Sequence, residues 1–244
     1  MKHLSALVLA LGTALWSQAG DKTPTIAAPK GAVPQVLFNG TTLEGWAGLP
    51  DHWKVSEGAI TGFTTKWAPL KNNTFLVWTN GTVADFELHL KYRIRGGNSG
   101  IQYRSELKDP AEFIVGGYQA DIDSSPRYTG ILYEERGRGI LAERGQQTLV
   151  KSVDGKTQVK VTANLNTADA LQKFIKDEDW NDYIIVARGN NVMHFINGHL
   201  MSTSVDLDAA KAPVQGILAL QIHTGPPMEV QFKDIKLFPL EAKP

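Results

Sequence analysis

Two short stretches of alternating polar and apolar residues carry side chains that could do chemistry. They span residues 96–106 and 117–123. Successive side chains of a β-strand point to opposite faces, so each stretch predicts a strand with one polar face. If the two strands are neighbours, their polar groups form one patch on a sheet surface. Those groups are Gln102, Arg104 and Glu106 in the first stretch, and Gln119, Asp121 and Asp123 in the second.

A third predicted strand, residues 216–223, adds an amide and an imidazole. Gln221 and His223 share one face of it, and His223 comes directly before the loop that begins at Thr224. Histidine has the unperturbed side-chain pKa nearest to neutral pH, so His223 is a candidate for proton transfer. The competing interpretation is a structural histidine with satisfied hydrogen bonds.

A glycine-rich segment, residues 130–141, opens as a strand and continues as a charged loop. It carries Tyr133, Glu134, Glu135 and Arg138, which we expect at the rim of the polar patch. Glycine lets a backbone come close to another group, which favours a loop that lies over a site. The competing interpretation is a solvated loop.

The composition excludes several classes of protein. The 244 residues contain no cysteine and 25 basic against 25 acidic residues, so no thiolate chemistry and no nucleic-acid partner are predicted. The motifs of zinc proteases, EF-hands, serine hydrolases and phosphate-binding loops are missing, and no cofactor is expected. Asp121 and Asp123 could together hold Ca²⁺ with the help of loop carbonyls.

The N-terminus has the pattern of a secretory signal. A short polar start, an apolar run and small residues before position 20 predict a signal peptide over 1–19, cleaved after Ala19. Residues 20–34 are rich in Pro, Thr, Ala and Lys and predict a flexible linker. No later segment is long and apolar enough to span a membrane. We therefore expect a periplasmic or secreted protein whose single domain spans 35–241.

The rest of the chain predicts an all-β fold. Many short strands are separated by Gly and Asn-Gly turns, which is typical of a two-sheet sandwich. The clearest alternation is at 86–95, with Phe86, Leu88, Leu90, Tyr92 and Ile94 on the expected core face. One short helix is predicted, capped by Asn166 or Thr167 and running to about Lys176.

An ordered set of motifs resembles the 3-keto-disaccharide hydrolase family over about residues 34–240. The resemblance implies a concanavalin-like jelly-roll sandwich with a concave binding face. No metal site is predicted, because the sequence contains no metal-binding motif. The motifs are Phe38-Asn39-Gly40, Gly45-Trp46, Asn98-Ser99-Gly100-Ile101, Tyr103-Arg104, Tyr118-Gln119, Asp123, Leu132-Tyr133, Trp180-Asn181, Asn197-Gly198, Leu220-Gln221, His223 and Gly225.

The resemblance also implies an enzyme that cleaves glycosides already oxidised at C3 by a partner oxidoreductase. A ketone at C3 acidifies the C2 proton, the C1 substituent leaves by β-elimination, and water adds back. This chemistry needs a base, an acid and a donor to the enolate oxygen. We expect Asp123 or His223 as the base, Glu106 or Glu135 as the acid and Arg104 as the donor. The remaining candidates are expected to bind substrate: Gln119, Asp121, Tyr133, Glu134, Arg138 and Gln221.

Two alternatives stay open at this point. A retaining glucanase on the same architecture needs two carboxylates about 5 Å apart, and the spacing of Asp121 and Asp123 is compatible with that. A carbohydrate-binding module without catalysis needs exposed aromatic rings that stack on sugars. Trp67, in a predicted loop before Pro69, is the ring to test for this role.

Overall fold

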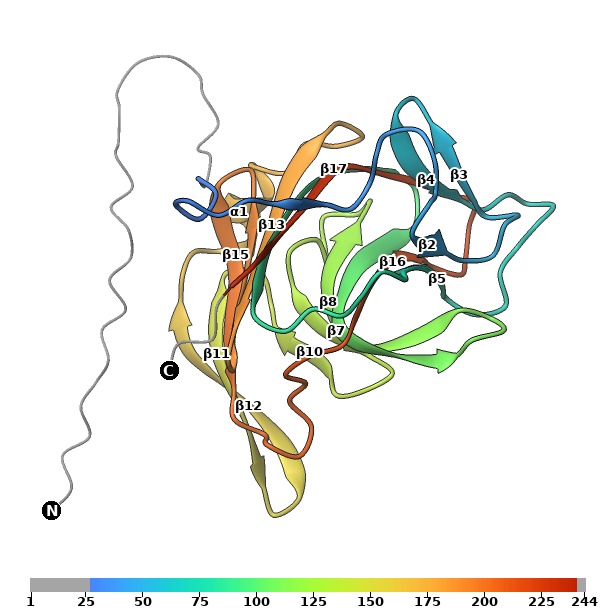
Figure 1. Ribbon diagram of the computed structural model, residues 1–244. Coiled ribbons are helices and arrows are strands. Elements are labelled where there is room, and N and C mark those ends of the chain that lie inside the picture. The colour runs from blue at the N-terminus through green and yellow to red at the C-terminus, as the bar shows by residue number, and fades with distance from the viewer. Residues whose placement is uncertain (1–26, 241–244) are drawn as a thin grey trace, which may run out of the picture.

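The computed structural model describes residues 27–240, which form two β-sheets packed face to face (Figure 1). Within these residues the one helix is α1 (Ala168–Gln172). The prediction of an all-β, two-sheet sandwich with one short helix is confirmed. The predicted signal peptide and residues 20–26 of the predicted linker lie outside the described residues. No helix in the described part of the chain is long and apolar enough to cross a membrane.

The larger sheet contains ten strands, all paired antiparallel except β11 with β15. A two-residue strand, β1 (Gln35–Val36), pairs with β17 beside the main path. The order across the sheet is β12 (Lys156–Asn164), β11 (Gln146–Val153), β15 (His199–Asp206), β14 (Asn191–Ile196), β13 (Asn181–Arg188), β6 (Phe86–Arg95), β17 (Glu229–Pro239), β4 (Ala59–Phe63) and β3 (Trp53–Ser56).

The smaller sheet contains seven antiparallel strands and carries the two polar stretches. Its β7 and β8 are direct neighbours, with Gln102 opposite Gln119 and Gly100 opposite Asp121. The expected pairing of these stretches is therefore present. The order is β10 (Gly139–Ala142), β9 (Leu132–Glu135), β8 (Ile114–Asp123), β7 (Asn98–Asp109), β16 (Ile217–Ile222), β5 (Thr74–Trp78) and β2 (Trp46–Ala47).

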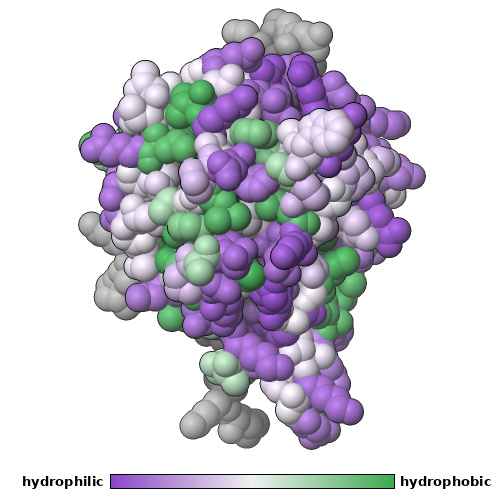
Figure 2. Space-filling model, turned by 90° about the vertical axis from the view of Figure 1, so that its right-hand side faces the viewer, coloured by the Kyte–Doolittle hydropathy of each residue, from purple (hydrophilic) through white to green (hydrophobic). Residues whose placement is uncertain are grey.

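The hairpin of β11 and β12 was not predicted from the sequence. It projects from the body of the sandwich at the lower end of both views (Figures 1 and 2). Almost every residue of β12 is exposed, so neither face of this strand needs an apolar row. Val159 and Val161 alternate with polar residues along β12, yet they are 43% and 44% exposed, so here the alternation does not mark a buried face.

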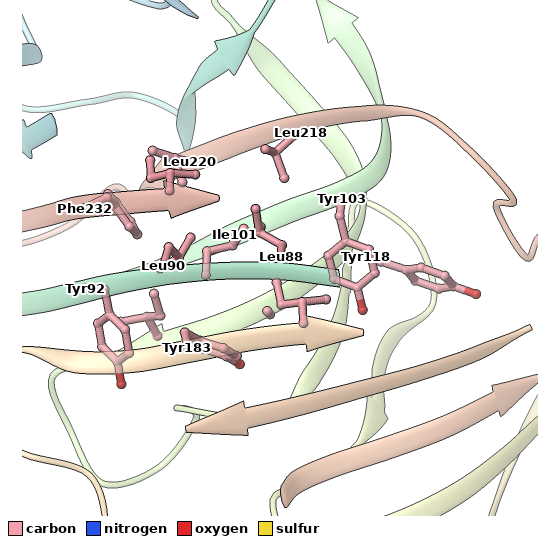
Figure 3. Close-up of a cluster of buried hydrophobic side chains, with 14 of the residues drawn as sticks. Leu88, Leu90, Tyr92, Ile101, Tyr103, Tyr118, Tyr183, Leu218, Leu220 and Phe232 are labelled. Carbon is pink, nitrogen blue, oxygen red and sulfur yellow. The ribbon is translucent and has the colours of Figure 1, made fainter. Parts of the chain in front are cut away.

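The core between the sheets follows the predicted alternation of β6. Phe86, Leu88, Leu90, Tyr92 and Ile94 are buried, whereas the residues between them are partly exposed. They meet the apolar face of the smaller sheet, which contributes the side chains of Ile101, Tyr103, Leu218 and Leu220 (Figure 3). This arrangement leaves the opposite, outer face of the smaller sheet for the polar side chains.

Helix α1 is shorter than predicted. Thr167 is the N-cap, and its Oγ1 accepts a hydrogen bond of 3.2 Å from the Ala170 amide. The helix ends at Gln172 instead of about Lys176. Asn181 binds both backbone groups of Lys176, accepting from its amide at 2.8 Å and donating to its carbonyl at 2.9 Å. Because Asn181 binds these backbone groups, Lys176 does not use them for the hydrogen bonds of an α-helix.

A bend in the β7–β8 hairpin shapes the outer face of the smaller sheet. The register of β7 shifts between Tyr103 and Glu106, and Arg104 has a positive φ of 47°. Beyond the bulge the hairpin turns back, and its Phe113 carbonyl accepts a 3.0 Å hydrogen bond from the Phe75 amide. The tip thereby covers a small second apolar cluster around Phe75, Val77 and Val115. The part of the outer face near the start of β7 stays open.

Candidate functional site

A pocket of about 400 Å³, here called the Asp121 pocket, lies on that open part of the outer face. Strands β8 and β9, the segment before β5 and the end of β16 supply its walls. The structure brings together six of the residues selected from the sequence. They are Gln119, Asp121, Asp123, Tyr133, Glu135 and His223.

Asp121 is the most perturbed acid of the pocket. Burial raises the pKa of its carboxyl to about 7, against the opposing effect of two amide donors, and the nearby Asp123 and Glu135 add to the rise. The donors are Asn98 Nδ2, 2.7 Å from Oδ1, and Gln119 Nε2, 3.0 Å from Oδ2. Near neutral pH this carboxyl exchanges a proton readily, which suits a general acid or base.

Side-chain amides connect Asp121 to a second carboxylate. Gln119 Nε2 also lies 3.4 Å from Gln221 Oε1, and Gln221 Nε2 lies 3.5 Å from Glu135 Oε2. The other oxygen of Glu135 accepts a hydrogen bond of 3.3 Å from Asn73 Nδ2. Gln221 is fully buried and does not line the pocket, but it joins two residues that do.

This amide chain continues away from the pocket and fixes the orientation of Gln119. Gln102 Nε2 donates to Gln119 Oε1 at 2.7 Å, and Ser105 Oγ donates to Gln102 Oε1 at 2.6 Å. The Gln119 oxygen is therefore occupied as an acceptor, and its nitrogen must face Asp121. An amide held this way supports a charge on Asp121 at one fixed position.

His223 presents one ring nitrogen as a possible base. Its Nδ1–H donates to the Thr224 carbonyl at 2.6 Å, because a carbonyl can only accept. In the neutral ring, Nε2 then keeps its lone pair. The Thr224 amide donates in turn to Asn73 Oδ1 at 3.0 Å, so Asn73 ties the His223 loop to Glu135.

Asp123 is held at the end of β8 by local hydrogen bonds. Its Oδ1 accepts from the Ser125 amide at 2.7 Å, and its own amide donates to Thr129 Oγ1 at 2.8 Å. Asp123 is half-buried at the mouth of the pocket. One of its oxygens has no protein donor among the described residues and can accept a substrate proton or hydroxyl.

Aromatic and aliphatic side chains complete the walls, among them Tyr128, Tyr133, Ile131 and Ile140. Burial raises the pKa of Tyr133, so this phenol stays protonated and can donate a hydrogen bond. The Ile131 carbonyl is anchored from the core by His194 Nδ1 at 3.2 Å. Burial lowers the pKa of His194 to about 3, so this histidine is neutral and structural.

Arg104 does not reach the Asp121 pocket, so it is not placed to serve as the enolate partner there, contrary to the expectation. Its guanidinium is buried on the other side of the bulge, where it donates to the Ala84 carbonyl at 2.6 Å and pairs with Asp85 at 2.8 Å. The register shift after Tyr103 breaks the two-residue alternation, so Ser105 takes the outward position instead. The alternation of polar and apolar residues along the sequence does not reveal a bulge of this kind.

Glu106 also lies away from the Asp121 pocket, contrary to the expectation. Its side chain is 73% exposed and pairs with Lys108. It lines a separate hollow near the bend of the hairpin. The same bulge explains the difference, because the residues directly after it change face relative to the simple count.

Glu134 and Arg138 form a buried ionic cluster instead of a pocket rim. Arg138 pairs with Glu134 at 2.5 Å and with Asp206 at 2.6 Å. The Tyr118 hydroxyl donates to the same Asp206 carboxylate at 2.5 Å. Neighbouring residues on a strand face opposite ways, so Glu134 turns from the pocket when Glu135 lines it.

The structure adds amide residues that the sequence analysis did not select. Asn98 shares the parity of Gln102 along β7, so alternation could have identified it. Asn73 lies in a loop and reaches Glu135 from 62 residues away, a contact that no local pattern reveals.

The donor set at Asp121 does not suit Ca²⁺. Both carboxylate oxygens accept hydrogen bonds from amide N–H groups, which a cation would repel. Within residues 27–240, no three His, Asp or Glu side chains are grouped as metal ligands.

The fold is similar to that of several carbohydrate-related structures. A candidate glycosyl hydrolase from Parabacteroides distasonis ATCC 8503 superposes with a TM-score of 0.56 at 18% identity, covering 85% of this chain and 100% of that one. Carbohydrate-binding module CBM66 from Bacillus subtilis gives 0.51 at 14% identity, covering 84% and 99%. A GlcNAcα1-4Gal-releasing endo-β-galactosidase from Clostridium perfringens gives 0.54 at 10%, covering 92% and 67%.

Similarities at these identities establish the fold alone. No curated protein matches the sequence of this chain. The sequence pattern of one family, described as the 3-keto-alpha-glucoside-1,2-lyase-like domain, matches residues 33–237, nearly the whole described chain. This protein therefore belongs to the 3-keto-disaccharide hydrolase family, as the motif resemblance predicted.

Proposed function

We propose that this protein cleaves 3-keto-glycosides by removing the C2 proton, eliminating the C1 substituent and adding water. The family and the fold support a carbohydrate-active function. The observation that carries the finer proposal is the content of the Asp121 pocket. It holds an acid with a pKa of about 7 together with a histidine whose Nε2 keeps its lone pair.

The elimination step removes one proton, from C2, and supplies one proton, to the departing oxygen. A base takes the C2 proton, the electron pair forms the C1–C2 double bond, and the C1–oxygen bond breaks. An acid protonates the departing oxygen. Water then adds across the C1–C2 double bond, with its hydroxyl bonding to C1 and a proton from solvent returning to C2. The C3 ketone makes this route possible because negative charge develops on its oxygen, where hydrogen-bond donors stabilise it.

We assign the base to His223 or Asp123, as the sequence analysis did. For the acid we favour Asp121 beside Glu135, because a carboxyl with a pKa near 7 is still partly protonated at neutral pH. The donors to the enolate oxygen are the amide groups of Asn73 and Asn98, which take the place expected for Arg104.

The substrate requires a preceding reaction of a defined class. Unmodified sugars carry a hydroxyl at C3, so an oxidoreductase that oxidises this position must supply the ketone. We propose that the protein works downstream of such an enzyme. We further propose export to the periplasm or beyond, on the basis of the signal pattern at residues 1–19.

The test uses the purified protein with a 3-keto disaccharide and its unoxidised parent, in H₂O and in D₂O. We expect consumption of the 3-keto sugar alone, with deuterium from solvent appearing at C2 of the product. Direct hydrolysis would leave C2 unlabelled and would refute the elimination route.

The same assay separates the two alternatives. Cleavage of the unoxidised glycoside at a similar rate would identify a glycosidase of the glucanase kind. Binding of both sugars without turnover of either would identify a binding module. Either result would overturn the proposal.

A further inference from the structure

Trp67 is the exception among the tryptophans of residues 27–240. Its side chain is 84% exposed, whereas Trp46, Trp53 and Trp78 are buried and Trp180 is half-buried. Exposing so large an apolar ring costs free energy unless a partner covers it. We infer that Trp67 forms an outer subsite, stacking on the leaving-group sugar of a glycoside held in the Asp121 pocket. This inference rests on the proposed function.

The turn that carries Trp67 is built to hold the ring in place. Thr65 Oγ1 accepts hydrogen bonds from the Trp67 amide at 3.3 Å and from the Ala68 amide at 3.1 Å. The Thr65 carbonyl accepts a further bond from Ala68, which closes the turn at 3.2 Å. Leu70 packs against the main core a few residues later. A backbone fixed in this way keeps the ring attached at a defined position, so the turn loses little conformational entropy when a sugar binds.

Both ends of the loop that carries Trp67 are bonded to the segment after His223, and one end also lines the pocket. At its start, Thr64 and Met228 exchange hydrogen bonds of 3.0 and 3.2 Å. At its end, Asn73 lines the pocket and binds the Thr224 amide. The loop thus begins and ends on the segment that follows His223.

Figure 1 shows the course of this loop, and Figure 2 shows the side of the molecule on which it lies. It crosses from β4 to β5 on the right-hand side of the molecule in Figure 1. Figure 2 views that side, where hydrophilic residues surround small hydrophobic patches. A surface of this mixed kind suits a sugar, whose rings have apolar C–H faces and polar edges.

The chemistry of the turn selects the class of ligand. An indole face matches the C–H face of a pyranose ring, and a planar aromatic leaving group offers the same kind of surface. The Lys66 ammonium lies over the Trp67 ring, 4.6 Å from its centre. A sugar therefore stacks on the opposite face or displaces this flexible side chain, and in either case the ammonium can donate to the sugar hydroxyls. Hydroxyls favour a sugar as the leaving group, and aromatic glycosides serve as the comparison.

The experiment compares substrates that differ only in the leaving group. The pair is a 3-keto disaccharide and the methyl 3-keto-glycoside, with a phenyl 3-keto-glycoside as a third arm. For Trp67→Ala we expect kcat/KM to fall about 3- to 10-fold on the disaccharide, mainly through KM, with no change on the methyl glycoside. Trp67→Phe should recover part of the loss. An equal loss on the phenyl glycoside would show that the subsite reads a flat ring rather than sugar hydroxyls, and would overturn the assignment to a sugar.

Trp180→Ala is the matched control. This ring stacks with Arg93 and Lys233, which belong to the larger sheet. Its removal should leave the ratio of kcat/KM on the disaccharide to kcat/KM on the methyl glycoside unchanged. If Trp67→Ala lowers kcat/KM equally on the disaccharide and the methyl glycoside, or leaves both unchanged, the subsite is refuted.

A binding measurement keeps the subsite testable if the proposed function fails. Should the wild type turn over none of these substrates, titration calorimetry with the unoxidised disaccharide decides. A Kd raised about 3- to 10-fold by Trp67→Ala supports the subsite, and an unchanged Kd refutes it.

Discussion

Single amide groups decide how the acids of the Asp121 pocket behave. Gln119 is locked by Gln102, so its nitrogen can only face Asp121 and Gln221. Burial opposes ionisation of Asp121, and the two donors favour it, so its pKa settles near 7 rather than higher. The carboxyl can therefore give and take a proton at neutral pH.

Replacement of Asp121 tests its role as the acid. We expect Asp121→Asn to lower kcat on a 3-keto-glycoside by about 10²–10⁴, the usual contribution of a proton-transfer group. The wild-type rate should fall as the pH rises through about 7, since Asp121 loses its proton there. Glu106→Gln is the matched control, because this exposed carboxylate lies outside the Asp121 pocket. Equal rates for Asp121→Asn and the wild type would remove Asp121 from the mechanism.

The same carboxyl makes a separate prediction about stability. Its pKa is about 7 in the folded protein and about 4 when unfolded, so the folded state binds the proton more tightly. This contribution is fully present below pH 4 and is lost as the pH rises through 7. The side chain of Asp121→Asn cannot ionise. We therefore expect the free energy of unfolding of the wild type to fall relative to that of the variant as the pH rises from 4 to 8. Urea denaturation at several pH values measures this, and a constant difference would contradict the burial of the charge.

At the scale of elements, one bulge in β7 reorganises the site. It turns Arg104 inward to Asp85, brings Ser105 to the amide chain and moves Glu106 to the solvent. Gly117 on the adjacent β8 makes room for it. A Cβ atom at Gly117 would lie 2.7 Å from the Ser105 Cα, and the φ of Gly117 is +141°.

We expect Gly117→Ala to destabilise the protein by about 2–4 kcal/mol, from steric overlap and from backbone strain. Gly155→Ala, at the tip of the β11–β12 hairpin, is the control. Its φ is also positive, +74°, but nothing lies within 4 Å of a Cβ there. Its cost should therefore be limited to strain, about 1 kcal/mol. Chemical denaturation of both variants compares them, and equal losses would argue against the close contact with Ser105.

At the scale of the whole molecule, the buried faces of the two sheets supply the main stabilisation. The alternating residues of β6 pack against β7 and β16 across the interior (Figure 3). This leaves the smaller sheet rigid enough for side chains on its outer face to keep fixed positions.

We expect Leu88→Ala to cost about 2–5 kcal/mol, because Leu88 is fully buried and its removal leaves a cavity. Val36→Ala, at a side chain that is 60% exposed, should change the stability by less than about 0.5 kcal/mol. Thermal denaturation checks both variants. A Leu88→Ala protein with an unchanged Tm would contradict the assigned core face.

The sequence by itself determined the features that depend on local backbone geometry. A strand exposes alternate residues, so the core face of β6 and the shared face of Gln119, Asp121 and Asp123 follow from the order of residues. The ordered motifs likewise identified the family. These predictions did not depend on how strands far apart in the sequence pair.

Tertiary structure decided which of the predicted polar residues share a site and which do not. The bulge that removed Arg104 and Glu106 arises where β7 meets β8 and β16, and the hairpin bends over the sheet. The reach of Asn73 to Glu135 joins residues 62 positions apart. The pKa of Asp121 depends on atoms brought around it from several strands. Burial and long-range hydrogen bonds are properties of packing, and alternation along one strand carries no information about them.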